Sequence, residues 1–143
     1  MKKSERRLTN REIEEILLTA GISPTAQRIA VYRYVAQEGN HPTAEEVKSA
    51  VDETLPKISL ATVYNTLRLF VQHDLLHECR FPHSDKVLYD DNAEPHHHFI
   101  DEETGELTDI GRDEVNITTL LKDKAIEVHG TTLILTGTRR RSR

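Results

Sequence analysis

The sequence predicts an α+β protein of two small units, a helical N-terminal half that ends in a β-hairpin and an α/β C-terminal half. Two observations lead to this prediction. Apolar residues recur at helical spacing up to about residue 73 and mostly alternate as in strands after it. The balance of basic and acidic residues also changes, about ten residues further along the chain. Residues 1–83 carry eleven basic and eleven acidic residues, whereas residues 84–143 carry eight and thirteen, so the net charge of −5 lies in the second half.

Four helices are expected in the first half, because apolar residues recur there at helical spacing, three of the four segments begin with a helix-starting residue, and most are followed by a glycine or proline. The expected helices are Arg11–Ala20, Ser23–Gln37, Thr43–Val51 and Ser59–His73. Leu75–Phe81 and Lys86–Tyr89 then alternate around Pro82–Asp85, as the strands of a hairpin do. Helices followed by a hairpin are the order of a winged helix-turn-helix DNA-binding domain, expected over residues 1–91 with the wing and hinge at about 75–94. A plain helical bundle is the alternative.

The fourth helix has two contrasting faces. Val63, Leu67, Phe70 and Val71 form an apolar face that is expected to be buried. The opposite face is small, hydrogen-bonding and singly cationic, which suits a helix that enters a major groove and contacts base edges and phosphates. The candidate DNA-binding residues are Ser59, Ala61, Thr62, Tyr64, Asn65, Arg68 and Arg28.

The second half reads as a small α/β unit over residues 95–143. The pattern predicts one helix, at Asp113–Lys122. It predicts strands at His96–Ile100, Glu106–Ile110, Ile126–His129 and Thr132–Thr136. About fifty residues make a thin core, and the last segment is β-prone, so we expect this unit to dimerise. Packing against its own first half is the alternative.

The triplet His96-His97-His98 lies in an acidic segment. On a strand His96 and His98 share a face, and Asp90 and Asp109 could converge on them. Imidazoles and carboxylates without a thiolate favour Fe(II) or Mn(II), with zinc as a competitor. Three surface histidines are one alternative. A small non-haem metalloenzyme is another, although the chain has no evident lid or phosphate-binding loop.

Composition excludes several classes of protein. No apolar run approaches the roughly 18 residues of a membrane span, and no apolar segment follows the basic N-terminus as in a secretory signal. One cysteine, Cys79, excludes a disulfide framework and a multi-cysteine zinc site within one chain. A cytoplasmic protein is expected. The net charge argues against a protein that simply coats nucleic acid.

Four motifs, in this order and spacing, resemble the ferric uptake regulator family of metal-dependent transcription factors across roughly residues 12–138. They are Gly21-Ile-Ser-Pro-Thr-Ala-Gln-Arg28, His41-Pro-Thr-Ala-Glu-Glu-Val47, Ile58-Ser-Leu-Ala-Thr-Val-Tyr-Asn-Thr-Leu67 and His96-His-His-Phe-Ile100. The resemblance implies a homodimeric repressor that binds a palindromic double-stranded DNA operator.

The resemblance also implies one regulatory metal site per chain. Its ligands would be His41, Asp90, His96, His98 and Asp109, with Asp91 in place of Asp90 if the loop is out of register. Because His41 comes from the DNA-binding half, the ion would hold the two domains together. The closed dimer would then set the spacing of its recognition helices.

Departures from the family pattern matter as well. Asp101 and Thr104 stand where most members have the first Cys-x-x-Cys pair, so a structural zinc is not expected. Asn65 replaces the usual arginine after Tyr64, and Pro95 replaces a histidine of the iron-sensing branch, although His97 and His129 could form a second site.

Asp90 and Asp109 resemble the peroxide-responsive branch, in which Fe(II) and peroxide oxidise a ligand histidine, here His41 or His96. The histidine triplet and Tyr64-Asn65 also resemble the iron response regulators, whose triplet is linked to haem. Cys79 is followed by Arg80 and not by proline, so the Cys-Pro haem motif is missing. Peroxide sensing is preferred, with iron or haem as the alternative signals.

Overall fold

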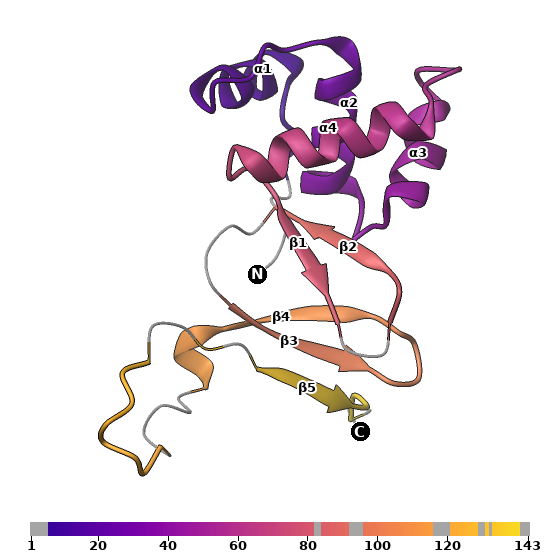
Figure 1. The fold of residues 1–143 in the computed structure, drawn as a ribbon. Coiled ribbons are helices and arrows are strands. Elements are labelled where there is room, and N and C mark those ends of the chain that lie inside the picture. Colours follow the sequence, from indigo (N-terminus) through magenta and orange to yellow (C-terminus); the bar gives the residue numbers. More distant parts are fainter. Residues whose placement is uncertain are drawn as a thin grey trace. The chain divides into compact units, whose positions relative to one another are not determined.

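The computed structural model describes residues 6–81, 84–91, 96–115, 121–128, 131 and 133–140. The chain divides into two compact units, Lys2–Ala93 and Glu94–Arg143. Within the described residues the N-terminal unit holds four α-helices and a two-stranded hairpin, and the C-terminal unit holds a three-stranded sheet (Figure 1). The α+β class predicted from the sequence is therefore confirmed.

The four helices of the N-terminal unit all start in the same way. A threonine or serine just before the helix accepts a hydrogen bond from the backbone N–H three residues later, which satisfies one of the free donors of the first turn. The helices are α1 (Asn10–Thr19), α2 (Ala26–Arg33), α3 (Ala44–Asp52) and α4 (Leu60–Gln72), and their N-caps are Thr9, Thr25, Thr43 and Ser59.

The start of the second helix was predicted one turn too early. Ser23-Pro24 lies before the helix, and α2 begins at Ala26 because the hydroxyl of Thr25 accepts the N–H of Arg28 at 3.2 Å. The helix then passes directly into a π-helical turn, η1 (Tyr34–Glu38), and ends at Gly39, close to the predicted end.

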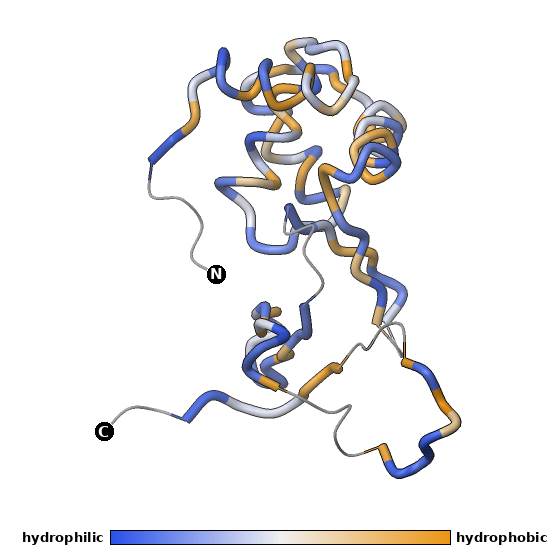
Figure 2. The backbone as a smooth tube through the Cα atoms, turned by 90° about the vertical axis from the view of Figure 1, so that its left-hand side faces the viewer, coloured by the Kyte–Doolittle hydropathy of each residue, from blue (hydrophilic) through white to orange (hydrophobic). Residues whose placement is uncertain are grey.

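The core of the N-terminal unit consists of the apolar stripes of its helices, and in Figure 2 apolar and polar residues alternate along each helix. Val63, Leu67 and Phe70 of α4 are fully buried, as predicted, whereas Val71 is half-buried. Phe70 meets the edge of Tyr32 with ring centroids 6.0 Å apart and planes at 86°, a favourable aromatic geometry. This packing leaves the opposite face of α4 in solvent.

The predicted hairpin is present as β1 (His77–Arg80) and β2 (Val87–Asp90), paired antiparallel with His77 opposite Asp90. Beyond the hairpin, the backbone N–H of Tyr89 donates to the carbonyl of Pro42 at 3.0 Å. That bond joins the end of β2 to the loop that precedes α3.

The sheet of the C-terminal unit has the order β4–β3–β5, where β3 is His96–Asp101, β4 is Leu107–Gly111 and β5 is Ile134–Gly137. β3 pairs antiparallel with β4 and parallel with β5. The first two strands were predicted to within one residue. The last was predicted at Thr132–Thr136, of which Thr132 lies outside the described residues, and it begins at Ile134.

Two predicted elements of the C-terminal unit are wrong in their described parts. The helix expected at Asp113–Lys122 is only a 3-10 turn, η2 (Arg112–Glu114), because the β-branched Val115 takes an extended backbone with φ −138° and ψ 123°. Residues 116–120 lie outside the described part. Ile126–Val128 of the strand expected at Ile126–His129 is not a strand. Ile126 is 53% exposed and Val128 42% exposed, so alternation there marks apolar surface.

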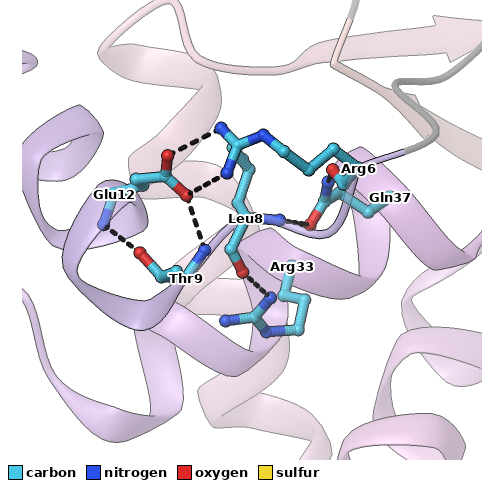
Figure 3. A network of polar contacts seen from close by, with 6 residues as sticks. All are labelled: Arg6, Leu8, Thr9, Glu12, Arg33 and Gln37. Carbon is cyan, nitrogen blue, oxygen red and sulfur yellow. Dashed lines mark hydrogen bonds and ion pairs between the residues drawn. The ribbon is translucent and has the colours of Figure 1, made fainter.

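A polar network ties the segment before α1 to α2 and η1 (Figure 3). The Glu12 carboxylate accepts two hydrogen bonds from the Arg6 guanidinium, at 2.7 and 3.2 Å, and one from the Thr9 N–H at 2.7 Å. The Gln37 amide accepts from the Leu8 N–H and donates to the Arg6 carbonyl. The hydrogen bonds from Arg6 and from Thr9 lower the pKa of Glu12 to about 2.

We expect Glu12 to contribute stability that depends on pH. Because its pKa is lowered on folding, its contribution is full above its ordinary pKa of about 4.5 and is lost as pH falls towards 2. Glu12→Gln should therefore unfold at a lower temperature than the unmodified chain at pH 7, and the difference should shrink between pH 4.5 and pH 2.

The matched control is Glu15→Gln in the same helix, where the carboxylate makes an exposed 3.9 Å ion pair with Arg11. Thermal unfolding followed by circular dichroism measures both variants. A Glu12→Gln difference that stays constant over this pH range would contradict the assignment.

Candidate functional site

His41 and Asp90, two of the predicted metal ligands, meet within the N-terminal unit. The Tyr89–Pro42 hydrogen bond brings the loop before α3 against the end of β2. As a result His41 Nε2 lies 3.4 Å from Asp90 Oδ2, and the two side chains are only 10% and 6% exposed. The charge of the neighbouring Asp91 acts instead on Tyr32, whose pKa is raised by burial and further by that charge. Asp90 is thus the carboxylate that faces His41.

The backbone at His41 is unusual. Its φ is +45°, in the left-handed region, and the next residue is Pro42, which disfavours helical conformations in the residue before it. A non-glycine residue held there costs on the order of 1–3 kcal/mol, and it persists only where the surroundings hold it. Such outliers cluster at functional sites. The strain at His41 therefore independently marks this loop.

Two of the triplet histidines and the second predicted carboxylate meet on the C-terminal sheet. His98 lies directly opposite Asp109 in the β3–β4 pairing. Asp109 Oδ1 is 3.2 Å from His96 Nε2 and 3.6 Å from His98 Nε2, and the two imidazole centroids are 4.5 Å apart. The three side chains offer ligand atoms that lie within 4.8 Å of one another. All three are at most 14% exposed.

His97 points to the other face of β3, as strand alternation predicts. It is 2% exposed, and its Nδ1 accepts a hydrogen bond from the Leu133 N–H at 3.0 Å. The Leu133 carbonyl in turn accepts from the His98 N–H at 3.0 Å. His97 therefore serves to hold the segment that leads into β5. His129, its predicted companion in a second site, lies outside the described residues.

The donor atoms fit a divalent transition metal. One imidazole and one carboxylate are presented by the N-terminal unit, and two imidazoles and one carboxylate by the C-terminal unit. Nitrogen and carboxylate oxygen donors without sulfur suit Fe(II), Mn(II) and Zn(II). Burial of these carboxylates away from water is costly unless a cation or proton accompanies them, which also favours a bound metal.

The predicted DNA-binding face of α4 is on the surface. Ala61, Asn65 and Arg68 are exposed, Tyr64 is 38% exposed and Thr62 is half-buried. Ser59 caps the helix, so its hydroxyl accepts the N–H of Thr62 at 3.0 Å. The structure therefore brings these residues to one face, at the helix that follows α3 in a helix-turn-helix order.

Arg28 lies apart from α4, on α2, and its guanidinium donates to the Ser23 carbonyl at 2.7 Å. Sequence reasoning missed Glu45, whose carboxylate accepts a 2.8 Å hydrogen bond from the Tyr64 hydroxyl. That bond lowers the pKa of Glu45 and raises the pKa of Tyr64. Glu45 was visible only as an acid in the first turn of α3, and nothing in the pattern connected it with Tyr64.

Comparison with known proteins agrees with this geometry. The family model described as "Ferric uptake regulator family" matches residues 19–136, most of the chain. The chain belongs to the ferric uptake regulator family. It is 36% identical over 108 residues to the peroxide-responsive repressor PerR of Staphylococcus aureus strain Mu50, covering 73% of this chain and 72% of that protein.

Solved structures of ferric uptake regulator family proteins share the fold. A zinc-bound manganese uptake regulator superposes with a TM-score of 0.73 at 25% identity and covers 90% of this chain and 98% of its own. The ferric uptake regulator of Vibrio cholerae superposes with a TM-score of 0.70 at 23% identity and covers 88% and 98%.

Membership in the ferric uptake regulator family decides between the classes of function that the sequence left open. The chain is a metal-dependent transcriptional regulator of this family and not an enzyme. The metalloenzyme alternative is therefore wrong. None of the described helices is long and apolar enough to cross a membrane.

The β3–β4 turn occupies the positions at which the family resemblance leads one to expect a Cys-x-x-Cys pair. Asp101 Oδ1 accepts hydrogen bonds from the N–H groups of Glu103 and Thr104, at 2.9 and 3.2 Å. The Asp101 carbonyl accepts from the Gly105 N–H at 2.7 Å, and Gly105 takes a φ of +73° that favours glycine. The turn is thus closed by hydrogen bonds that its first residue, Asp101, accepts.

We expect His97 to matter for stability through its bond to Leu133. In His97→Ala the Leu133 N–H loses its acceptor, which costs about 1–3 kcal/mol of unfolding free energy. Exchange of the Leu133 amide proton, measured by NMR, should accelerate accordingly. Glu106→Gln, an exposed change in the same unit, serves as the control and should leave that exchange rate unchanged. Equal exchange in both variants would show that His97 does not hold Leu133.

Proposed function

We propose that the protein is a DNA-binding repressor that acts as a homodimer on a palindromic operator and releases it when peroxide oxidises an Fe(II)-binding histidine. The observation that carries this proposal is that each of the two units brings imidazole and carboxylate donors together. His41 and Asp90 face each other in the unit with the α4 face, and His96, His98 and Asp109 converge in the other. A single ion that takes ligands from both units would fix how the recognition helices are spaced.

The metal would control DNA binding by linkage. An ion that binds the form competent for DNA more tightly than the open form shifts the equilibrium towards the competent form by that difference in affinity. Two recognition helices must lie about one helical turn of DNA apart to enter successive major grooves.

The charge of the DNA-binding half indicates why its binding would depend on a fixed geometry of the dimer. Residues 1–83 carry eleven basic and eleven acidic residues, which cancel, so non-specific attraction to phosphates is weak. On the α4 face Arg68 is the single cation among the candidate contacts. Specific binding would therefore depend on both α4 helices of the dimer being placed at once, which is the property that the ion supplies.

The peroxide signal is supported by the similarity to the Staphylococcus aureus repressor, whose name states its response. Fe(II) held by the imidazoles and carboxylates of the site would supply the redox chemistry for this reaction. Overall, one imidazole carbon would exchange its hydrogen for a hydroxyl group taken from hydrogen peroxide, and one water molecule would be released. The family resemblance makes His41 and His96 the candidates, and each has its Nε2 beside a ligand carboxylate, as His98 also does. An oxidised imidazole is a poorer ligand, so the ion and the operator would be released.

Replacement of His41 tests the metal link between the units. His41→Ala should lower Mn(II) affinity by about tenfold or more and weaken metal-dependent operator binding in parallel, while the dimer remains intact. Metal titration, DNA gel shift and sedimentation measure the three properties. His73→Ala, at an exposed histidine that follows α4 and contacts the Ala20 carbonyl, is the matched control. Undiminished metal-dependent operator binding by His41→Ala would refute the link.

Mass spectrometry tests the signal. Peroxide treatment of the Fe(II)-loaded protein should add one oxygen atom to the peptide containing His41 or to that containing His96. The Mn(II)-loaded protein should stay unmodified, because Mn(II) is a much weaker reductant of peroxide. Release of the operator should follow the same time course as the modification. Unmodified histidines in the Fe(II) form would instead favour iron or haem as the signal.

A further inference from the structure

Asn40 is placed against the ring of His41, on the side away from Asp90. Asn40 Oδ1 lies 2.8 Å from His41 Nδ1, whereas His41 Nε2 lies 3.4 Å from Asp90 Oδ2. An amide oxygen can only accept a hydrogen bond, so His41 Nδ1 must carry the proton in this contact. In the neutral form of this tautomer the lone pair is on Nε2, the nitrogen that faces Asp90, where a cation between the two groups could use it.

The backbone indicates that this contact is built into the fold. Asparagine tolerates the left-handed conformation better than histidine does, yet the residue with φ +45° is His41 and not the preceding Asn40. With the left-handed conformation at His41, the side chain of Asn40 lies beside the His41 imidazole. The Tyr89–Pro42 hydrogen bond on the far side of His41 holds the same loop against β2. The imidazole thus has a hydrogen-bond acceptor at one nitrogen and Asp90 near the other.

We infer that Asn40 is a positioning residue for the metal ligand His41, because its side-chain oxygen fixes the ring as the Nδ1–H tautomer and directs Nε2 towards a divalent cation shared with Asp90. Metal-binding histidines generally donate their second ring N–H to an oxygen acceptor, which sets the tautomer and the ring orientation. This inference rests on the proposed role of His41 as a ligand. It adds a residue that none of the sequence motifs contains.

The test compares Asn40→Ala, which removes the acceptor, with Asn40→Asp, which keeps an acceptor oxygen at the same position. Nitrogen NMR of the histidine rings in the full-length, metal-free protein reports the His41 tautomer directly. We expect His41 to carry its proton on Nδ1 in the unmodified chain and in Asn40→Asp, and a substantial Nε2–H population in Asn40→Ala. Mn(II) titration should give an affinity about 10–100-fold lower for Asn40→Ala and restored for Asn40→Asp.

The outcomes separate this inference from the proposed function. If His41→Ala weakens Mn(II) binding while Asn40→Ala changes neither tautomer nor affinity, the role of Asn40 is overturned and the ligand role of His41 stands. If His41→Ala leaves Mn(II) binding unchanged, the proposed ligand set itself fails. Should Asn40→Ala not fold, the unmodified chain decides, because a neutral His41 ring in the metal-free protein that carries its proton on Nε2 and not on Nδ1 overturns the inference without any variant.

Discussion

The hydrogen bond from the Tyr89 N–H to the Pro42 carbonyl is the contact on which the chemistry of the N-terminal unit depends. It joins the second strand of the wing to the loop before α3, two segments that are distant in the sequence. His41 and Asp90 are the residues on either side of that junction, so their approach to 3.4 Å follows from it. The same loop leads through Thr43 into α3, which packs against α4. A metal at His41 would therefore act on an element one helix away from the candidate DNA-binding face.

The two groups of candidate ligands, one in each unit and here called half-sites, are held in place by different interactions. In the C-terminal unit strand pairing positions the ligands, because His98 and Asp109 are directly opposite and His96 lies two residues along the same face. In the N-terminal unit a loop must be held in a left-handed conformation by hydrogen bonds on both sides. A half-site on a sheet is rigid in the absence of metal, whereas one on a strained loop loses its geometry more easily. The geometry of the loop half-site is thus the more sensitive of the two to loss of the metal.

The sequence was sufficient where local chemistry decides the structure. The N-caps and apolar stripes predicted three of the four helices closely, and alternation placed His96 and His98 together and His97 apart. It was insufficient where long-range contacts decide. Nothing in the pattern connected Glu45 with Tyr64 or placed Asn40 on the His41 ring. In the described part of the segment after Glu114 the prediction failed because Leu121, Ile126 and Val128 lie on the surface and not in a core, so their spacing does not reflect burial.

The turn closed by Asp101 has a consequence for how the protein withstands an oxidant. A turn held by thiolates on a metal opens when its sulfurs are oxidised, because oxidised sulfur no longer binds the ion. A carboxylate that accepts backbone hydrogen bonds has no such weak point. The oxidation of a ligand imidazole that is proposed above would then release the metal without opening this turn. The sheet that carries His96 and His98 would keep the hydrogen bonds that hold it.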